Sequence, residues 1–238
     1  MINLLDLEKT DFQDIQLREK LAVLYSAAGV PTKYHFNNLN DHWSQNYSPN
    51  GALTGVAKKR SEMVYEFTKS YLEAMEGILN GYPLKVKFKK QTVLVTDVFF
   101  DGGKGSGKTF ILSVLAQRAI NMGFTAKFVS WASFVDSFLT FDSMKENEKL
   151  FQDCMEVDLL IFDSVFDYDI NNNKFFSVKL DNLISSRTAS NKITICSIDT
   201  TYNQNPSFGY IWNKFSRETF TIKLPGATNE NKSTRART

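Results

Sequence analysis

The chain has 238 residues, 42% of them apolar, and carries 28 Lys and Arg against 26 Asp and Glu. This length is enough to bury the core of one domain, or of one domain with an appendage. The formal net charge of +2 is too small to indicate a nucleic-acid partner by itself, although local basic patches are compatible with it. The two cysteines, Cys154 and Cys196, lack metal-ligand spacing, which argues against a zinc site or a disulfide framework.

The N-terminus shows no targeting pattern. MINLLDLEKTDF reaches acidic residues before an apolar stretch of signal-peptide length develops. No run approaches the ~18 apolar residues of a membrane-spanning helix. We therefore expect a cytoplasmic protein with no membrane partner.

The first 58 residues differ in character from those that follow. Residues 11–29 are compatible with one amphipathic helix, whereas residues 35–55 are rich in Asn, Ser and Gly, as loops are. A second helix is predicted over 60–81 and ends at Gly81. Its apolar positions at helical spacing, which indicate a core-facing stripe, are Val64, Phe67, Tyr71, Met75, Ile78 and Leu79.

A basic strand is predicted next. KVKFKK, residues 85–90, alternates so that Lys85 and Lys87 share one face. Two interpretations are open: the lysines contact nucleic-acid phosphates, or they protect a sheet edge against aggregation, which is the slightly favoured alternative. Further basic groups at 58–60 and in the tail, at Lys232, Arg235 and Arg237, are open to the same two interpretations, phosphate contact or solubilising charge.

A glycine-rich loop joins a strand to a helix in the middle of the chain. Residues 92–100 are rich in β-branched and aromatic residues, and an amphipathic helix follows until Gly123. The loop has the spacing G-x-x-x-x-G-K-T from Gly102 to Thr109. Backbone N–H groups and the helix N-terminus bind phosphate in such loops, Lys108 reaches the β and γ phosphates, and the Thr109 hydroxyl ligates Mg²⁺. The residues predicted to bind ATP are Gly102, Gly103, Lys104, Gly105, Ser106, Gly107, Lys108 and Thr109.

The remainder alternates strands with helices. Strands are predicted at 125–131, 158–162, 192–198 and 219–224, with helices at 133–141, 145–155, 174–187 and around 210–216. With the strand before the loop this gives five strands, and the alternation indicates an α/β fold with a parallel sheet and helices on both faces. Two aromatic residues, Trp131 and Phe134, lie at and just after the end of the strand predicted at 125–131. They are open to two interpretations: stacking on a nucleic-acid base or, more favoured, packing in the core.

A carboxylate follows the strand with the longest apolar run. VDLLIFDS, residues 157–164, indicates a strand buried on both faces, and Asp163 stands at its carboxyl end. Ligands of open α/β sheets gather at this edge. Asp163 is therefore predicted to hold Mg²⁺ together with Thr109.

With both motifs placed, the chain resembles the AAA+ ATPases of the DnaC/DnaI helicase-loader and IstB transposition-helper family over residues 28 to 224. AGVPTKYHFNNL (28–39) is similar to the entry segment of the family, VDLLIFDS to its VDLLIIDD phrase, and RTASNKITICSID (187–199) to its arginine-containing helix end and following strand. The resemblance implies a five-stranded AAA+ P-loop sheet and ATP with Mg²⁺. It also implies a helicase partner bound by the N-terminal region, and single-stranded DNA bound by the ATPase domain.

The resemblance also assigns catalytic residues. Asp199 falls where the family places a sensor asparagine; it either orients the attacking water or is an ordinary loop aspartate. Arg217 is the candidate arginine finger, with Lys214 as an alternative, and Arg187 matches another family arginine. Residue type alone favours a solvated surface position for each of these arginines. Arg235 is a candidate second sensor, although we expect no small lid domain of the kind that usually carries it in the family.

One departure concerns hydrolysis. Family members have a second acid after the Mg²⁺ aspartate, and this chain has Ser164 there. Asp167 or Asp169 is a substitute if the following loop folds back. We therefore expect an ATPase with slow intrinsic hydrolysis, in which ATP acts mainly as a binding switch.

These features predict three parts: an N-terminal helix and loop for partner docking and site entry (1–58), an AAA+ ATPase domain (59–224) and a flexible basic tail (225–238). The leading hypothesis is an ATP-dependent loader that delivers a hexameric, DnaB-like replicative helicase onto single-stranded DNA. A homo-oligomer on the helicase ring is part of this hypothesis. The alternatives are an IstB-type helper of a DNA transposase, a P-loop small-molecule kinase, for which no arginine-dense lid is found, and an adaptor that binds ATP without hydrolysing it.

Overall fold

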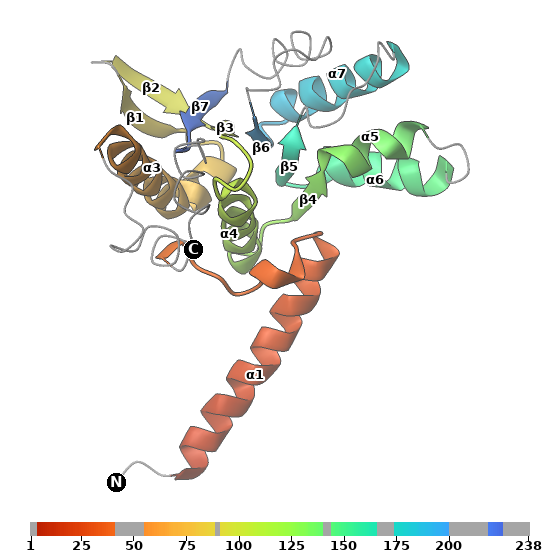
Figure 1. Cartoon of the computed structure of the whole chain (residues 1–238). Coiled ribbons are helices and arrows are strands. Elements are labelled where there is room, and N and C mark those ends of the chain that lie inside the picture. The colour runs from red at the N-terminus through yellow and green to blue at the C-terminus, as the bar shows by residue number, and fades with distance from the viewer. Residues whose placement is uncertain are drawn as a thin grey trace, which may run out of the picture.

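The centre of the molecule is a five-stranded parallel sheet (Figure 1), in a computed structural model that describes residues 4–40, 55–88, 91–139, 144–165, 174–199 and 219–225. Neighbouring strands follow the order β4-β5-β6-β3-β7. Their bounds are β3 Val98–Asp101, β4 Ala126–Ser130, β5 Leu159–Val165, β6 Ile193–Ile198 and β7 Phe220–Lys223. The predicted α/β class and the five parallel strands are confirmed.

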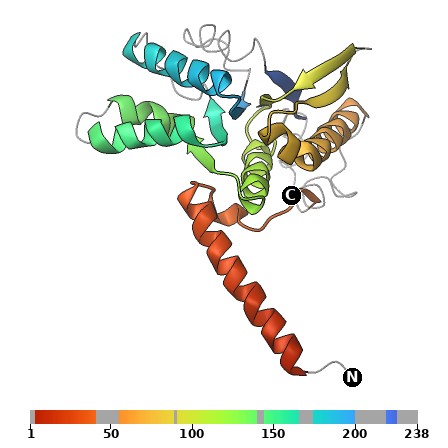
Figure 2. The same ribbon diagram turned by 180° about the vertical axis from the view of Figure 1, so that it is seen from behind.

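Helices cover both faces of this sheet because its strands alternate their apolar side chains. In β3, Val98 and Phe100 pack into one core and Phe99 into the other. The first core is shared with α3 (Gly55–Leu79) and α4 (Lys108–Asn121). The second is shared with α5 (Trp131–Leu139), α6 (Met144–Glu156) and α7 (Lys174–Ala189), which lie together across the sheet from α3 in both ribbon views (Figures 1 and 2).

The single strand predicted over 92–100 is in fact two. β2 (Gln91–Val95) pairs antiparallel with β1 (Leu84–Phe88), whereas β3 joins the parallel sheet. The break falls at Thr96 and Asp97, whose polar groups are used by other elements. The carbonyl of Thr96 accepts the Tyr71 hydroxyl at 2.5 Å, and Asp97 Oδ1 accepts the backbone N–H of Thr194 at 2.9 Å. These contacts end one sheet and begin the other.

Helix α1 (Leu4–Ala27) stands away from the sheet and meets it only near its C-terminal end (Figures 1 and 2). There the Tyr25 hydroxyl donates to Asn121 Oδ1 at 2.6 Å, and the carbonyl of Ala28 accepts the N–H of Phe128 at 2.6 Å. Gly29 follows with φ +85°, and a Cβ there would collide with the carbonyl of Phe128. Within the described ranges, no helix combines the length and apolarity needed to cross a membrane.

Candidate nucleotide site

The glycine loop lies between β3 and α4, as the sequence predicts, and its backbone curls at two glycines. Gly105 and Gly107 have φ values of +81° and +91°, and Gly107 is the residue before the first turn of α4. An L-residue with a Cβ adopts this left-handed backbone only with strain. The amino end of α4 therefore begins at this loop, and the positive end of a helix dipole favours an anion.

Lys108 is folded back onto the loop that it follows. Its ammonium donates to the carbonyl oxygens of Gly102 and Gly103, the second at 3.1 Å. Since an ammonium has three donors, this arrangement keeps the cation over the loop and leaves capacity for a phosphate oxygen. The location fits the predicted role of Lys108 at the β and γ phosphates.

The loop is packed closely enough to require glycine at its first position. A Cβ on Gly102 would lie 2.7 Å from Ser106 Oγ and 2.9 Å from Leu224 Cβ. The Ser106 hydroxyl is buried and has no hydrogen-bond partner among the described residues. A buried polar atom without a partner is costly, and a bound phosphate oxygen or water is the ordinary remedy. This orphaned hydroxyl is an observation in favour of a ligand in the loop.

Asp163 meets Thr109 across the sheet edge, as predicted from two separate motifs. Thr109 Oγ1 donates to Asp163 Oδ2 at 2.8 Å, and Ser197 Oγ donates to Asp163 Oδ1 at 2.5 Å. A hydroxyl and a carboxylate side by side are the oxygen ligands that Mg²⁺ takes from protein when phosphates and waters complete its shell. The donor set therefore fits Mg²⁺, with Thr109 and Asp163 as the residues that would hold it.

Ser164 follows Asp163 in a left-handed conformation. Its φ is +61°, and the pairing of β5 with β6 shifts register between Phe162 and Val165. The N–H of Ser164 donates to Ser197 Oγ at 2.7 Å. Ser197, which the sequence analysis missed, thus bridges Asp163 and the bulge. The predicted substitutes for the missing acid, Asp167 and Asp169, lie outside the described residues.

Asp199 comes directly after β6 and lies beside the loop. Asp199 is 7% exposed, and its Oδ2 lies 3.9 Å from the position that a Cβ on Gly103 would take. The N–H of Gly102 donates to the carbonyl of Ile198 at 3.0 Å, which fixes the end of β6 against the start of the loop. The structure therefore brings Asp199 to the same edge as Lys108 and Asp163.

The entry segment is held against α4 by one side chain. Gln117, buried in α4, donates to the carbonyls of Tyr34 at 2.9 Å and Ser113 at 3.0 Å, and accepts the N–H of Phe36 at 2.6 Å. The Tyr34 ring, in the short helix η1 (Thr32–Tyr34), meets Phe110 edge-on with centroids 5.8 Å apart. The segment over 28–39 is thereby fixed beside the first turns of the P-loop helix. No motif in the sequence points to Gln117.

The expected arginines have separate outcomes. Arg187 is 1% exposed and donates to carbonyls at the ends of other elements, so it is a buried structural residue and not the surface arginine that its residue type favoured. Arg217, Lys214 and Arg235 lie outside the described residues, so their roles stay predictions.

The structure contradicts base stacking by Trp131 and Phe134. Both rings are 0% exposed. Helix α5 begins at Trp131, directly after β4, so its first turn faces the sheet and both rings pack edge-on against Phe162, with centroids 5.5 and 4.8 Å away. Packing in the core, the alternative from the sequence, is what the structure shows.

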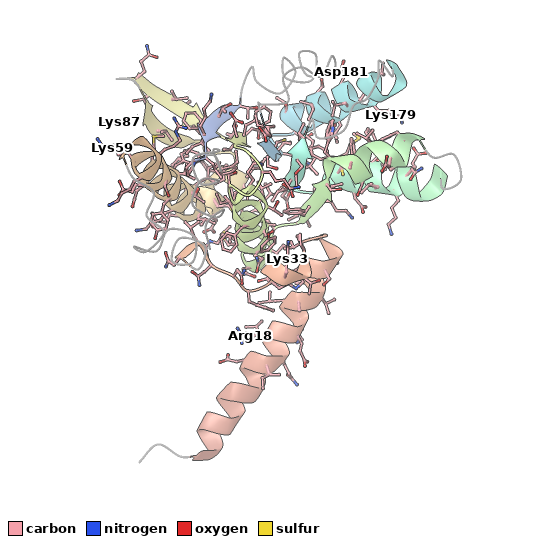
Figure 3. The ribbon with its side chains drawn as sticks, in the orientation of Figure 1. Arg18, Lys33, Lys59, Lys87, Lys179 and Asp181 are labelled. Atoms are coloured by element: carbon pink, nitrogen blue, oxygen red, sulfur yellow. The ribbon has the colours of Figure 1, made fainter. Side chains whose placement is uncertain are left out.

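The lysines of β1 are exposed. Lys85 and Lys87 pair across the hairpin with Leu94 and Thr92, so the four side chains share one face. Lys87 and Lys59 of α3 extend outward on the same side of the view in Figure 3. This placement allows contact with nucleic-acid phosphates and is equally compatible with protection of a sheet edge.

Comparison with known proteins adds a family and several similar folds. The family model of IstB-like ATP-binding proteins matches residues 88–208. The crystal structure of DnaI has a TM-score of 0.55 at 14% identity and covers 82% of this chain and 90% of its own. The DnaC helicase loader has a TM-score of 0.54 at 13% identity, with 82% and 99% covered.

A third similar structure is the replication initiator DnaA bound to AMPPCP and single-stranded DNA, with a TM-score of 0.53, 17% identity, and 76% and 50% covered. The chain thus spans about half the length of the replication-initiator structures it matches. No curated protein sequence matches this chain. At these identities the structural matches show a shared fold, that of the P-loop ATPases.

The family match spans more than half of the chain and includes the glycine loop, Asp163 and Asp199. The loop has the geometry of a phosphate site, and the strand order places the loop and both aspartates at one sheet edge. The resemblance inferred from the sequence is therefore confirmed, and the chain belongs to the family of IstB-like ATP-binding proteins.

Proposed function

We propose that the protein is an ATP-dependent loader that delivers a hexameric, DnaB-like replicative helicase onto single-stranded DNA. The observation that carries this proposal is that the P-loop site lies on a fold that extends over 99% of the DnaC helicase loader. The similarity to DnaI, at 90% of that chain, points the same way.

The nucleotide site supplies the chemistry of such a loader. Lys108 and the loop of residues 102–107 bind the phosphates of ATP, and Thr109 and Asp163 hold Mg²⁺, which neutralises phosphate charge when bound. Lys108 donates to the carbonyls of Gly102 and Gly103 and has a third donor for a phosphate oxygen. Because Gly102 is also bonded to the end of β6, ATP binding acts on the loop and on that strand together.

ATP acts in this proposal mainly as a binding switch with slow intrinsic turnover. Efficient hydrolysis needs a group that positions the attacking water. Strand β5 ends in Asp163 and then Ser164, so it offers no second carboxylate directly after the Mg²⁺ residue. Arg217 is proposed as a finger that completes the site of a neighbouring subunit in an oligomer on the helicase ring. The N-terminal part of the chain is proposed to dock the helicase.

The second candidate function is an ATPase helper of a DNA transposase, and the matched family model, named for IstB, favours it. Both candidates bind DNA without reading bases, and Lys85 and Lys87 are proposed phosphate contacts in either case.

Complex formation separates the two candidates. The purified protein is mixed with the replicative helicase, or with a transposase, from the same source, with ATP, ADP or no nucleotide, and the mass of the complex is measured. ATP turnover is measured in parallel, alone and with single-stranded DNA. A complex with the helicase that depends on ATP supports the loader. A complex with the transposase and none with the helicase would replace it by the helper.

A further inference from the structure

We infer that Gln117 is a positioning residue through which the nucleotide site controls the entry segment (28–39) and helix α1. This role rests on the proposed function, because it describes how ATP, acting as a binding switch, reaches the part of the chain proposed to dock a partner. Three observations support it: a polar stripe on α4, a strained residue that Gln117 holds, and the contacts of that residue with α1.

The polar stripe runs along one face of α4, starting at the P-loop. Ser113, Gln117 and Asn121 are spaced four residues apart and therefore share this face. The Ser113 hydroxyl donates to the carbonyl of Thr109 at 2.7 Å, and Gln117 Nε2 donates to the carbonyl of Ser113 at 3.0 Å. The stripe thus begins at the residue proposed to hold Mg²⁺ and extends to Asn121, where α4 ends.

The entry segment is attached both to this stripe and to the first turn of α4. Gln117 uses both ends of its amide, since Nε2 donates to the carbonyl of Tyr34 at 2.9 Å and Oε1 accepts the N–H of Phe36 at 2.6 Å. The Tyr34 ring meets Phe110, which directly follows Thr109. Because Gln117 is 4% exposed, loss of the docked segment would leave its amide short of partners in a buried position.

Phe36 is held in a strained conformation. Its φ is +64°, in the left-handed region that a bulky residue enters only at a cost. Such a residue persists where the surrounding contacts determine it, and strained residues are common in switch regions. Here one such contact is the bond from its N–H to Gln117 Oε1. Phe36 therefore has two alternatives, a strained backbone bonded to Gln117 and a relaxed backbone without that bond.

The ring of Phe36 extends this docking to α1. Its centroid lies 5.4 Å from that of Tyr25, and the guanidinium carbon of Arg18, labelled on α1 in Figure 3, lies 5.2 Å from it. The Tyr25 hydroxyl donates to Asn121, at the end of the stripe, at 2.6 Å. Gln117 and Asn121 therefore attach the entry segment and the C-terminal part of α1 to the helix that begins at the nucleotide site.

ATP and the entry segment bind the same part of α4. ATP binds its first turn through Lys108 and Thr109, and the segment contacts Phe110 in that turn and Gln117 further along. Each is expected to order the helix and so to favour the other. Linkage makes the effect reciprocal, so the factor by which ATP favours docking equals the factor by which docking raises ATP affinity. Gln117 acts on ATP only through the segment.

The first test is hydrogen exchange of the full chain with and without Mg²⁺ and AMPPCP, an ATP analogue that is not hydrolysed. In wild type, AMPPCP is expected to slow amide exchange by about tenfold in the entry segment and in residues 14–27 of α1. Gln117→Met keeps the side-chain size and removes the hydrogen bonds. It is expected to abolish this protection and to lower AMPPCP affinity, measured by calorimetry, by the same factor.

The matched control is Thr68→Val. It removes a buried hydroxyl that donates to the carbonyl of Val64 within α3, and it is expected to leave both the protection and the affinity unchanged.

A second variant, Phe36→Ala, tests the step to α1 and does not depend on the folding of Gln117→Met. The Phe36 side chain is 38% exposed, and the N–H of residue 36 stays available to Gln117. AMPPCP is therefore expected to protect the entry segment in this variant but no longer to slow exchange in residues 14–27. Protection of α1 equal to that in wild type would overturn the proposed control of α1.

The outcomes distinguish failure of this role from failure of the proposed function. If wild type does not bind AMPPCP, the proposed function fails, and the role of Gln117 with it. If wild type binds AMPPCP but exchange in the entry segment does not change, or if Gln117→Met keeps wild-type affinity and protection, the role of Gln117 is wrong and the ATP-binding function remains. If Gln117→Met is less stable in urea but AMPPCP still protects its entry segment, Gln117 is only structural and the inference is wrong.

Discussion

Two cations lie at opposite ends of the central sheet and are held in different ways. At the amino edge, Arg187 is 1% exposed and donates to the carbonyls of Cys154 and Val157, each at 2.8 Å, and of Ile193 at 2.5 Å. At the carboxyl edge, Lys108 is half-buried, and among the described residues it donates to two carbonyls of its own loop.

The two cations differ in how many of their hydrogen-bond donors are already used within the protein. The guanidinium of Arg187 joins the end of α6 to the starts of β5 and β6, and its Nε donates to Thr194 Oγ1 at 3.0 Å. Burial lowers its pKa to about 10, against the opposing effect of Asp97 and other nearby groups. Its donors are used within the protein. Lys108 retains a donor, and Ser106 beside it has an unused hydroxyl. The fully hydrogen-bonded Arg187 therefore fits a structural role, whereas the unused donors of Lys108 and Ser106 fit a ligand site.

Arg187→Met gives the largest expected effect and tests the structural half of this comparison. Methionine fills much of the same space but leaves the carbonyls of three elements without a donor, which is expected to lower the free energy of unfolding by about 3 kcal/mol. Urea denaturation measures it. The control Arg118→Ala removes an exposed arginine from α4 and is expected to change stability by less than about 0.5 kcal/mol. Equal stability of Arg187→Met and wild type would show that the hydrogen bonds of the Arg187 guanidinium are dispensable.

Lys108→Ala tests the assignment of the second cation to ligand binding. We expect at least about a 100-fold loss of ATP affinity, since a charge-assisted contact to phosphate is removed, with little change in stability. Calorimetric titration with ATP measures the first and urea denaturation the second. Lys149→Ala, an exposed lysine of α6, is the matched control. Unchanged ATP affinity, or a loss of stability as large as that of Arg187→Met, would contradict the assignment of Lys108 to the ligand.

The sequence predicted the parts of the site that depend on local pattern. The loop from Gly102 to Thr109 needs only a strand before it and a helix after it, and both were visible in the spacing of apolar residues. Asp163 was predicted because a strand buried on both faces ends there, and parallel strands present their carboxyl ends at one edge. The alternation of strands and helices predicted the sheet for the same reason.

The parts that failed depend on contacts between distant segments. Arg187 was expected at the surface because arginine is rarely buried, and no local sequence pattern indicates that carbonyls of α6, of the segment before β5 and of β6 accept its hydrogen bonds. Ser197 is one hydroxyl in an apolar strand, and only the register of β5 against β6 brings it to Asp163. The break at Thr96 and Asp97 was hidden because both sides of it favour strands.

Ser197→Ala gives the smallest of these effects and concerns a residue that is buried like Arg187 but lies next to the proposed Mg²⁺ ligand. Ser197 is 0% exposed, like a structural residue, yet it contacts Asp163 and the N–H of Ser164. Groups that orient a metal ligand typically contribute 10- to 100-fold to metal affinity or activity, so we expect the Mg²⁺ concentration that half-saturates ATP binding to rise by about tenfold.

The measurement is ATP affinity across a Mg²⁺ titration, with binding in excess chelator as the baseline. If Ser197 orients Asp163, the variant loses the Mg²⁺-dependent part of the affinity and keeps the metal-free baseline. The control is Thr68→Val, which removes a buried hydroxyl that donates to the carbonyl of Val64 within α3. If the variant is less stable but its Mg²⁺ titration is unchanged, Ser197 has a purely structural role, like Arg187. Its hydrogen bonds would then serve only to join β5 to β6.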